Sequence, residues 1–454
     1  MNDPRIQQLN RKHCVEGQYV LYWMQQSQRA EDNPALEYAI RTANKLGLPV
    51  VVAFGLTPDY PDANLRHYTF MLQGLRDVSR KLARRRIRFV VQHGNPPEVA
   101  LKLGHNAAEI ICDRGYLRHQ RRWRSDMAGE AKCLVEQVEC DAIVPVEVAS
   151  NKRESSARTF RPKVFRLQHL FLDRPPTAKP KVSASGLSLN CLNLKDEDSV
   201  LGVPILDVSV KPVSFFKGGT HAAKARLSRF IRSRLRGYSE NRNQPGLDYL
   251  SHMSPYLHFG QISPAYIVRK IRDSGKGTQK DRDSYLDELI VRRELAINFV
   301  HYADNYDRFD GLPEWAQSTL QQHRRDKRKK IYTLKELEDA RTHDPYWNAA
   351  MNEMKSAGYM HNYMRMYWGK QILAWSLTPE IAFKTVLELN NKYFIDGRDP
   401  SSYANVGWIF GLHDRPWPKR EIFGSVRSMT IGGLKRKANP DAYVKKVERL
   451  LRSQ

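Results

Sequence analysis

The stretch Gln18–Gly55 reads QYVLYWMQQSQRAEDNPALEYAIRTANKLGLPVVVAFG and decides the fold of the N-terminal part of the chain. Its two ends, Gln18–Met24 and Pro49–Gly55, are continuous apolar runs, the pattern of strands buried on both faces of a parallel sheet. Between them we predict a helix that starts after the N-cap Asn33 and stops at Gly47. This strand–helix–strand unit predicts a right-handed crossover in an α/β layer.

The same alternation continues to about residue 150. Further apolar runs predict strands at Ile87–Gly94, Ala108–Asp113 and Cys140–Glu147, with amphipathic helices between the earlier ones. The fold class we expect is a doubly wound parallel sheet. No GxGxxG follows the first strand, so the common dinucleotide site is not predicted. A ligand of this part is expected at the carboxyl ends of the strands.

A chain of 454 residues is too long for one simple core and predicts two or three domains. From Asp173 the periodic pattern gives way to a stretch rich in Pro, Ser and Lys, which is typical of a linker. After Thr220 nearly every segment has helical spacing. We therefore predict a Rossmann-like α/β domain over 1–172, a linker over 173–219 and an all-α domain over 220–454.

Composition narrows the class of protein. The chain holds 74 Lys and Arg against 49 Asp and Glu, a net charge of +25, which favours nucleic acid as a partner. A basic enzyme that binds no polyanion is the alternative. The five cysteines are scattered without a CxxC pair, so we predict no metal site and a reducing, cytoplasmic compartment. No apolar run is long enough to cross a bilayer, so no membrane partner is expected.

Three C-terminal motifs carry polar groups that suit a ligand, although each also has an ordinary structural explanation. LSHMSPYLHFGQISP places Ser251 and Ser254 near a helix start, where they suit a phosphate or simply cap the helix. DGRDPSSYANVGW places Asp396 and Asp399 around a Gly, as in many polar turns. LDELIVRREL places Glu288 four positions before an Arg, the spacing of a weak surface ion pair.

The segment Tyr359–Ser376, YMHNYMRMYWGKQILAWS, is an unusual helix. At helical spacing His361, Arg365, Trp368 and Trp375 form one stripe. A face that served packing alone would be aliphatic, whereas this one aligns a guanidinium with two indoles about 10.5 Å apart along the axis. The alternative is that the indoles only fill a core.

In this order, the motifs SPYLHFGQISP, ELIVRREL, MHNYMRM and DGRDPSSYANVGW resemble the signatures of the photolyase/cryptochrome family. The resemblance covers the whole chain: an α/β antenna domain, a linker and a helical flavin domain. Within the family the chain is most similar to the class II cyclobutane pyrimidine dimer photolyases. Its ELIVRREL has a second Arg and lacks the Trp of the common bacterial form, and its DGRDP has an inserted Arg.

The resemblance implies a carbon–carbon lyase that repairs UV-damaged DNA under blue light. Its cofactor is FAD, active as the reduced anion FADH⁻ and bent into a U shape. The excited cofactor passes an electron to a pyrimidine dimer flipped out of the DNA, which is easier for damaged, poorly stacked bases. A second, light-harvesting chromophore is expected in the N-terminal domain, with 8-hydroxy-5-deazaflavin favoured over a folate.

The resemblance also assigns residues to the lesion and to DNA. Glu288 is expected to hydrogen-bond a carbonyl of the dimer and, when protonated, to stabilise the charge that develops there. Trp408 and Met366 are expected to form apolar walls. Arg242 and Arg292 are expected to contact DNA.

A buried anionic flavin needs a cation, which the resemblance assigns to Arg365 held by Asp396. Asn390 is favoured over Asn405 as the amide beside flavin N5. The residues implied for FAD are Tyr238, Ser251, Ser254, Asn362, Arg365, Asp396, Asp399, Asn390 and Asn405.

Members of the family carry an electron to photoexcited oxidised flavin along a chain of tryptophans. The resemblance makes Trp368 the proximal member, with Trp375 and a bridging Trp347 behind it. The order of the later hops is left open by the sequence.

Two other functions remain as alternatives at this stage. One is a cryptochrome-like blue-light receptor or a (6-4) photolyase, although no extra active-site histidine accompanies His361. The other is a light-independent, basic nucleic-acid-binding protein. We expect a monomer that acts where the DNA is, in the cytoplasm of a prokaryote or the nucleus of a eukaryote.

Overall fold

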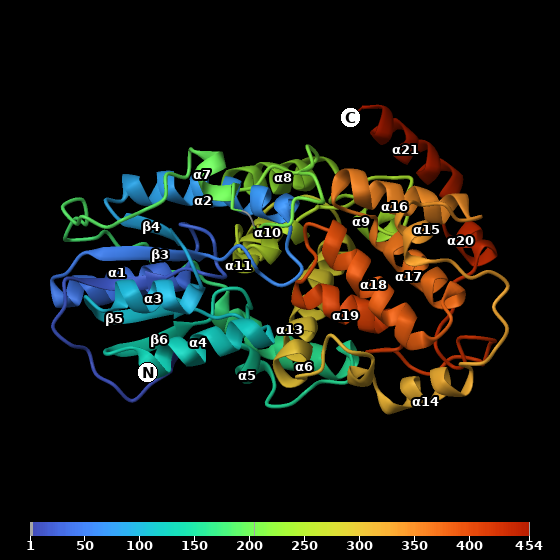
Figure 1. The fold of residues 1–454 in the computed structure, drawn as a ribbon, viewed down its shortest axis with the longest axis horizontal. Coiled ribbons are helices and arrows are strands. Elements are labelled where there is room, and N and C mark those ends of the chain that lie inside the picture. The colour runs from blue at the N-terminus through green and yellow to red at the C-terminus, as the bar shows by residue number, and fades with distance from the viewer. Residues whose placement is uncertain (1–2, 204, 454) are drawn as a thin grey trace.

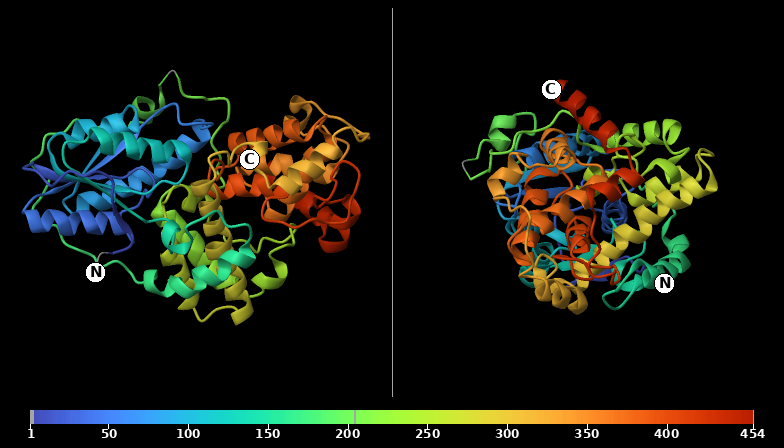
Figure 2. Two further views of the ribbon diagram at one scale, coloured as in Figure 1. Left: turned by 90° about the horizontal axis from the view of Figure 1, so that it is seen from below. Right: turned by 90° about the vertical axis from the view of Figure 1, so that its right-hand side faces the viewer.

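The computed structural model describes residues 3–203 and 205–453. A sheet with helices on both faces forms one end of the molecule, and a body made almost wholly of helices forms the other (Figure 1). Two further views show the same division (Figure 2). The predicted fold class, an α/β part followed by an all-α part, is confirmed.

The sheet has the strand order β1-β6-β5-β2-β3-β4 within the described residues. Strands β2 to β6 run parallel to their neighbours, whereas β1 pairs antiparallel with β6. Every residue of β2 and β3 is buried, which explains their continuous apolar sequences. The strands are β1 Ile6–Gln8, β2 Tyr19–Trp23, β3 Val50–Leu56, β4 Arg88–His93, β5 Ala107–Asp113 and β6 Leu134–Val138.

One predicted strand is wrong. Cys140–Glu147 forms no strand but a buried loop that runs into the short helix α5, Val146–Ala149. The backbone N–H of Ile143 donates to the carboxylate of Glu294 in the helical body, so the loop bonds to a side chain instead of a strand. The sheet position is filled by β6, whose sequence LVEQV mixes polar and apolar residues and gave no clear signal.

The helix α1 begins and ends where the sequence predicts. The side chain of Asn33 accepts a hydrogen bond from the N–H of Leu36, and Gly47 ends the helix in the left-handed conformation at φ 68°. Three more helices complete the layers around the sheet (Figure 1). The bounds are α1 Pro34–Leu46, α2 Leu65–Arg84, α3 Pro96–Gly104 and α4 Arg118–Glu130.

The rest of the described chain is helical with one long connector. Between α12 and α13 the helix widens into a π-helical turn, η2. The bounds are α6 Ala157–Leu167, η1 Gln168–Phe171, α7 Glu197–Leu201, α8 Thr220–Ser233, α9 Tyr238–Asn241, α10 Ser254–His258, α11 Pro264–Arg272, α12 Gln279–Leu286, η2 Asp287–Arg292, α13 Arg293–Tyr302, η3 Phe309–Gly311, α14 Glu314–Gln322, α15 Leu334–Glu338, α16 Pro345–Ala357, α17 Asn362–Trp375, α18 Pro379–Tyr393, α19 Pro400–Ile409, α20 Ile431–Lys437 and α21 Pro440–Arg452.

The predicted linker lies along the α/β part before α8 begins. The N–H of Leu192 donates to the carbonyl of Val91 in β4, and α7 packs against α2. Helices α5 and α6 precede residue 172 and yet contact α13 and η2 of the helical body. The division at 172 and 219 stays a prediction. Among the described helices, none has the length and apolar character needed to cross a membrane.

Candidate active site

A cavity of about 920 Å³ opens into the helical body. Its walls come from α9, α10, η2, α13, α17, α18 and α19 and from the irregular chain after α19. A second cavity of about 220 Å³ shares lining residues with it, among them Tyr238, Ser251 and Arg365. Together they make one branched site with a wide arm and a narrow arm.

Most of the predicted site residues meet at these two arms. The wide arm alone is lined by Glu288, Met366, Trp408, Arg242, Arg292, Trp368 and Asn390; both arms by Tyr238, Ser251, Ser254, Asn362, Arg365 and Asn405; and the narrow arm alone by Asp396 and Asp399. Trp347 and Trp375 are the two predicted residues that line neither arm.

Arg365 is fixed by several contacts at the junction of the arms. Its Nη2 donates to both carboxylate oxygens of Asp396, at 2.9 and 3.1 Å, and its Nε donates to the carbonyl of Met360. The guanidinium carbon lies 3.8 Å from the ring centre of Phe394. The two charged side chains are only 15% and 8% exposed, so the ion pair is largely removed from water.

The helix that carries Arg365 starts later than the predicted stripe. It begins at Asn362, and His361 is its N-cap, with the ring accepting the N–H of Tyr363. Burial lowers the pKa of His361 to about 3, so the ring is a neutral acceptor. His361 therefore caps the helix and does not belong to the helical stripe, which begins at Arg365.

Asp399 serves both a turn and the site. Its side chain caps α19 by accepting the N–H of Ser401, and it lies 3.4 Å from Nδ1 of His258. Burial raises the pKa of Asp399 and is the largest single influence, but His258, Arg293 and the N–H of Ser401 together outweigh it, so the pKa is lowered and the carboxylate stays ionised. The polar-turn explanation is thus correct for this residue and does not exclude a ligand.

Glu288 lies in the π-helical turn η2 and is 36% exposed toward the wide arm. Its carboxylate accepts a hydrogen bond from Arg242 at 2.8 Å, across 46 residues of sequence. The predicted weak pairing with Arg292 is absent from the described residues, because Arg292 turns to Asp287 at 3.7 Å. A π turn displaces one residue from helical register and is common at functional sites.

The three predicted tryptophans form a continuous stack. The rings of Trp368 and Trp347 lie nearly parallel, with centres 6.4 Å apart, and Trp375 meets Trp347 edge-on at 5.6 Å. The indole N–H of Trp347 donates to the carbonyl of Trp368. Trp347 is thus in contact with both other indoles, and Trp375 in turn contacts Tyr332 and His343.

The two candidate asparagines differ in their surroundings. Asn390 is buried in α18 beside the wide arm, and its amide donates to the side chain of Asn391. Asn405 is exposed to both arms. The oxygen of Asn391 also accepts the backbone N–H of Arg398, so the Asn390 side chain is connected to the DGRD turn.

Several residues of the wide arm lie outside the predicted motifs. His413, Asp414 and Arg427 line it from the irregular chain that follows α19. Arg427 lies over the rings of Trp408 and Trp417, at 5.8 and 4.8 Å. This segment has neither helical nor strand periodicity, and only its mixture of aromatic and basic residues could have marked it.

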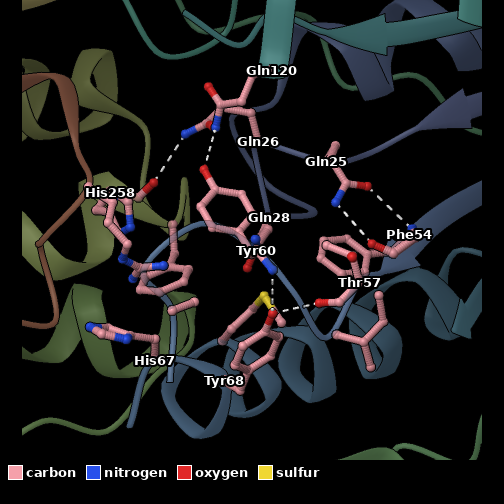
Figure 3. A pocket seen from close by; sticks show the side chains of 16 residues that line it. Gln25, Gln26, Gln28, Phe54, Thr57, Tyr60, His67, Tyr68, Gln120 and His258 are labelled. Atoms are coloured by element: carbon pink, nitrogen blue, oxygen red, sulfur yellow. Dashed lines mark hydrogen bonds between the residues drawn. The ribbon is translucent and has the colours of Figure 1, made fainter. Parts of the chain in front are cut away.

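A separate cavity of about 60 Å³ lies where the α/β part meets the helical body (Figure 3). Its wall is formed by the end of β3 and the chain that follows β2 and β3, by residues of α2 and α4, by His258 and Phe259 at the end of α10, and by Arg398. Side-chain amides link its edges: Gln26 donates to the carbonyl of His258, and Gln120 to the hydroxyl of Tyr60 (Figure 3). The carboxyl ends of the strands do therefore border a cavity.

Arg398 is the notable group in this second cavity. It has φ 66° and is 2% exposed, and its Nε and Nη2 have no partner among the described residues. Burial lowers the pKa of its guanidinium. Gln28 likewise has a buried Oε1 without a partner there. Buried guanidinium N–H groups without hydrogen-bond partners are costly, which points to a ligand that carries an anionic or strongly accepting group.

Comparison with known proteins gives consistent matches. A family model described as DNA photolyase matches residues 20–181. The deoxyribodipyrimidine photo-lyase of Methanothermobacter thermautotrophicus is 48% identical over 98% of this chain and 98% of its own length. That of Potorous tridactylus is 38% identical over 95% of this chain and 82% of its own. A class III photolyase structure from Agrobacterium tumefaciens has a similar fold, with a TM-score of 0.73 at 19% identity, covering 95% of this chain and 87% of that one.

Proposed function

The chain belongs to the DNA photolyase family, and from this premise we propose that it repairs cyclobutane pyrimidine dimers in DNA with light and reduced FAD. The full-length similarity to deoxyribodipyrimidine photo-lyases makes it a lyase that acts on UV-damaged DNA. The single structural observation that carries the proposal is the branched site, where Arg365 and Glu288 face one cavity with a tryptophan stack behind it.

The residues present fit FAD. A wide and a narrow arm that meet at Arg365 suit a bent ligand, and the hydroxyls of Ser251, Ser254 and Tyr238 line the shared part. The buried indole N–H of Trp368 lines the wide arm and has no acceptor among the described residues. A volume near the upper end of the ~300–1,000 Å³ typical of small-molecule sites leaves room for a second occupant.

When bound, reduced FAD supplies on excitation the electron that opens the cyclobutane ring, and it recovers that electron afterwards. We propose that the chain's own residues do the rest. Arg365 compensates the negative charge of the reduced flavin, and Asp396 holds the guanidinium in place. Asn390 presents its amide beside the ring system, and Trp408 and Met366 form apolar walls that receive the flipped dimer.

Glu288 and Arg242 form the polar side of the proposed lesion site. Because they already pair with each other, an arriving dimer meets an oriented carboxyl and a cation instead of two mobile chains. We propose that Glu288 in its protonated form donates a hydrogen bond to a dimer carbonyl, and that Arg242 and Arg292 bind the DNA phosphates that flank the lesion.

The function is tested directly with irradiated DNA. The purified protein with chemically reduced flavin should remove cyclobutane dimers under blue light and leave them intact in darkness. Removal of dimers in darkness would contradict a light-driven reaction. Removal of (6-4) products instead of cyclobutane dimers would favour the (6-4) photolyase alternative.

Replacing Glu288 with alanine should lower the quantum yield of splitting several-fold while flavin stays bound. The change removes the partner of the dimer carbonyl and frees Arg242. The measurement is dimers repaired per absorbed photon, with the flavin already reduced. The quantum yield of Glu288→Gln should lie between those of Glu288→Ala and the unchanged protein. Glu240→Ala changes another acidic residue of the same cavity, and its yield should equal that of the unchanged protein. An unchanged yield in Glu288→Ala would show that this residue takes no part in the reaction.

We propose that the light-harvesting chromophore occupies the cavity between the two parts of the molecule. Its aromatic and amide lining suits a flat heterocycle. The two nitrogens of Arg398 that lack a partner among the described residues, Nε and Nη2, suit an anionic ring oxygen, which favours 8-hydroxy-5-deazaflavin over folate. At about 60 Å³ the cavity is smaller than usual ligand sites, so the wall side chains must move aside on binding.

Arg398→Met should abolish loading of this chromophore while FAD binding is retained. The side chain faces the N-terminal cavity and lines neither arm of the branched site. The check is reconstitution with 8-hydroxy-5-deazaflavin, followed by the excitation spectrum of energy transfer to FAD. Equal loading of both proteins would show that the chromophore does not use Arg398.

We further propose that the protein works as a monomer in the compartment that holds the DNA. The branched site is lined by side chains from at least seven helices of the chain itself, which is compatible with a single copy acting alone. Sedimentation of the complex with a short damaged duplex tests the stoichiometry.

A further inference from the structure

Two indoles face the wide arm of the branched site, those of Trp368 and Trp408. Both are therefore within reach of the flavin proposed there. We expect only Trp368 to serve as the electron donor, because Trp408 is proposed to form a wall of the lesion site. The surroundings of the two rings differ in a way that separates these roles.

Trp368 is placed to lose an electron. Its ring stacks on Trp347, which contacts Trp375, so a positive charge left behind can move away along the stack. In the part of the chain that the structure describes, no Lys or Arg lies over any of these three rings. The cation on the same helix face, Arg365, lies over Phe394 and not over Trp368, and its charge is paired with Asp396.

Trp408 has the opposite surroundings. The Nζ of Lys370 lies 5.1 Å from the centre of its ring, and the guanidinium of Arg427 lies 5.8 Å away. Lys370 is completely buried and donates to the carbonyl of Ile409, next to Trp408 in the chain. No other aromatic ring contacts Trp408 among the described residues, so a positive charge on it would have no neighbour to pass to.

We propose that Lys370 and Arg427 suppress electron loss from Trp408, so that photoreduction of the flavin draws on Trp368. The inference rests on the proposed flavin site. A cation beside an aromatic ring stabilises the neutral indole and destabilises its radical cation by charge repulsion. In the suppressed step one electron leaves the indole and is gained by photoexcited oxidised flavin, and no bond forms or breaks. Lys370 acts through Trp408 and lines neither arm of the site.

The test uses protein with oxidised FAD and the change Trp368→Phe, which removes the intended donor. Adding Lys370→Met, which nearly keeps the length of the side chain without the charge, should raise the rate of flavin fluorescence quenching by roughly tenfold, because the removed charge lies close to the ring inside the protein, where charges interact more strongly than in water. Burial lowers the pKa of Lys370 to about 7, with Asp414 opposing and Arg427 reinforcing the effect. The comparison is therefore made near pH 6, where the ammonium is charged.

Two further variants isolate the indole. Adding Trp408→Phe to the Lys370→Met protein should return quenching to its earlier rate, because phenylalanine is a far poorer donor. Mass spectrometry after illumination in air should find oxidised Trp408 in the Lys370→Met protein above the level in its parent. Arg427→Gln removes the second cation from the cavity wall and should also raise quenching, which keeps the test valid if Lys370→Met folds poorly.

The outcomes separate this inference from the proposed function. If FAD does not bind to the unchanged protein, the flavin site itself is wrong. If FAD binds and neither Lys370→Met nor Arg427→Gln changes the quenching rate, the shielding of Trp408 is overturned. A rise that survives Trp408→Phe would also overturn it, because the extra electrons would come from another residue.

Discussion

Arg365→Leu is expected to yield a protein that holds little flavin, or flavin that cannot be kept reduced. The change removes the cation at the junction of the two arms and leaves the carboxylate of Asp396 buried without a partner. Breaking a buried pair in this way costs about 3–5 kcal/mol. The ratio of flavin to protein and the absorbance of reduced flavin under dithionite measure the outcome, with thermal unfolding recorded beside them.

A matched double variant separates stability from cofactor chemistry. Arg365→Leu combined with Asp396→Asn removes the stranded carboxylate, so folding stability should recover while reduced flavin still fails to accumulate. Arg365→Lys keeps the charge but loses the two-oxygen contact with Asp396, and should hold flavin weakly. Normal accumulation of reduced flavin in the double variant would show that the stabilising cation is another residue.

Trp368→Phe is expected to stop or greatly slow the light-driven reduction of oxidised FAD by an external thiol. Trp368 is the one member of the tryptophan stack that lines the cavity, so its loss separates Trp347 and Trp375 from the flavin. Splitting of dimers should continue after reduction with dithionite, because that electron comes from flavin already reduced. The loss of the larger ring should cost about 1–3 kcal/mol of stability.

The control is a tryptophan that matches Trp368 in burial alone. Trp23 is fully buried in β2 of the sheet and lines neither arm of the branched site. Trp23→Phe should lose comparable stability and keep photoreduction. If Trp368→Phe retains photoreduction, the three tryptophans serve only to pack the core. If the variant loses both photoreduction and repair, the flavin site has collapsed.

The sequence by itself determined the features that depend on contiguous residues. Continuous apolar runs identified β2 and β3, because strands buried on both faces tolerate no polar alternation. Asn33 and Gly47 marked the ends of α1 because capping is a contact with the next few residues of the same segment. The four motifs, read in order, indicated the family for the same reason, because each motif is short and its spacing is local.

Contacts between distant segments were decided only by the tertiary structure. Cys140–Glu147 has a strand-like composition, but its backbone is bound by Glu294 from the helical body, and no local signal reveals a partner 151 positions away. Glu288 pairs with Arg242 and not with the Arg four positions later, because the π turn changes the register of the helix.

The same holds for the two buried cations that the proposals use. Arg398 follows Asp396 by two residues, yet its left-handed backbone sends its side chain to the other cavity. Lys370 appears in the sequence as one polar residue in an aromatic helix, and only the packing of α17 against α19 brings its charge to the ring of Trp408. A charge acts through space and not along the chain, so its effect is set by the fold that places it.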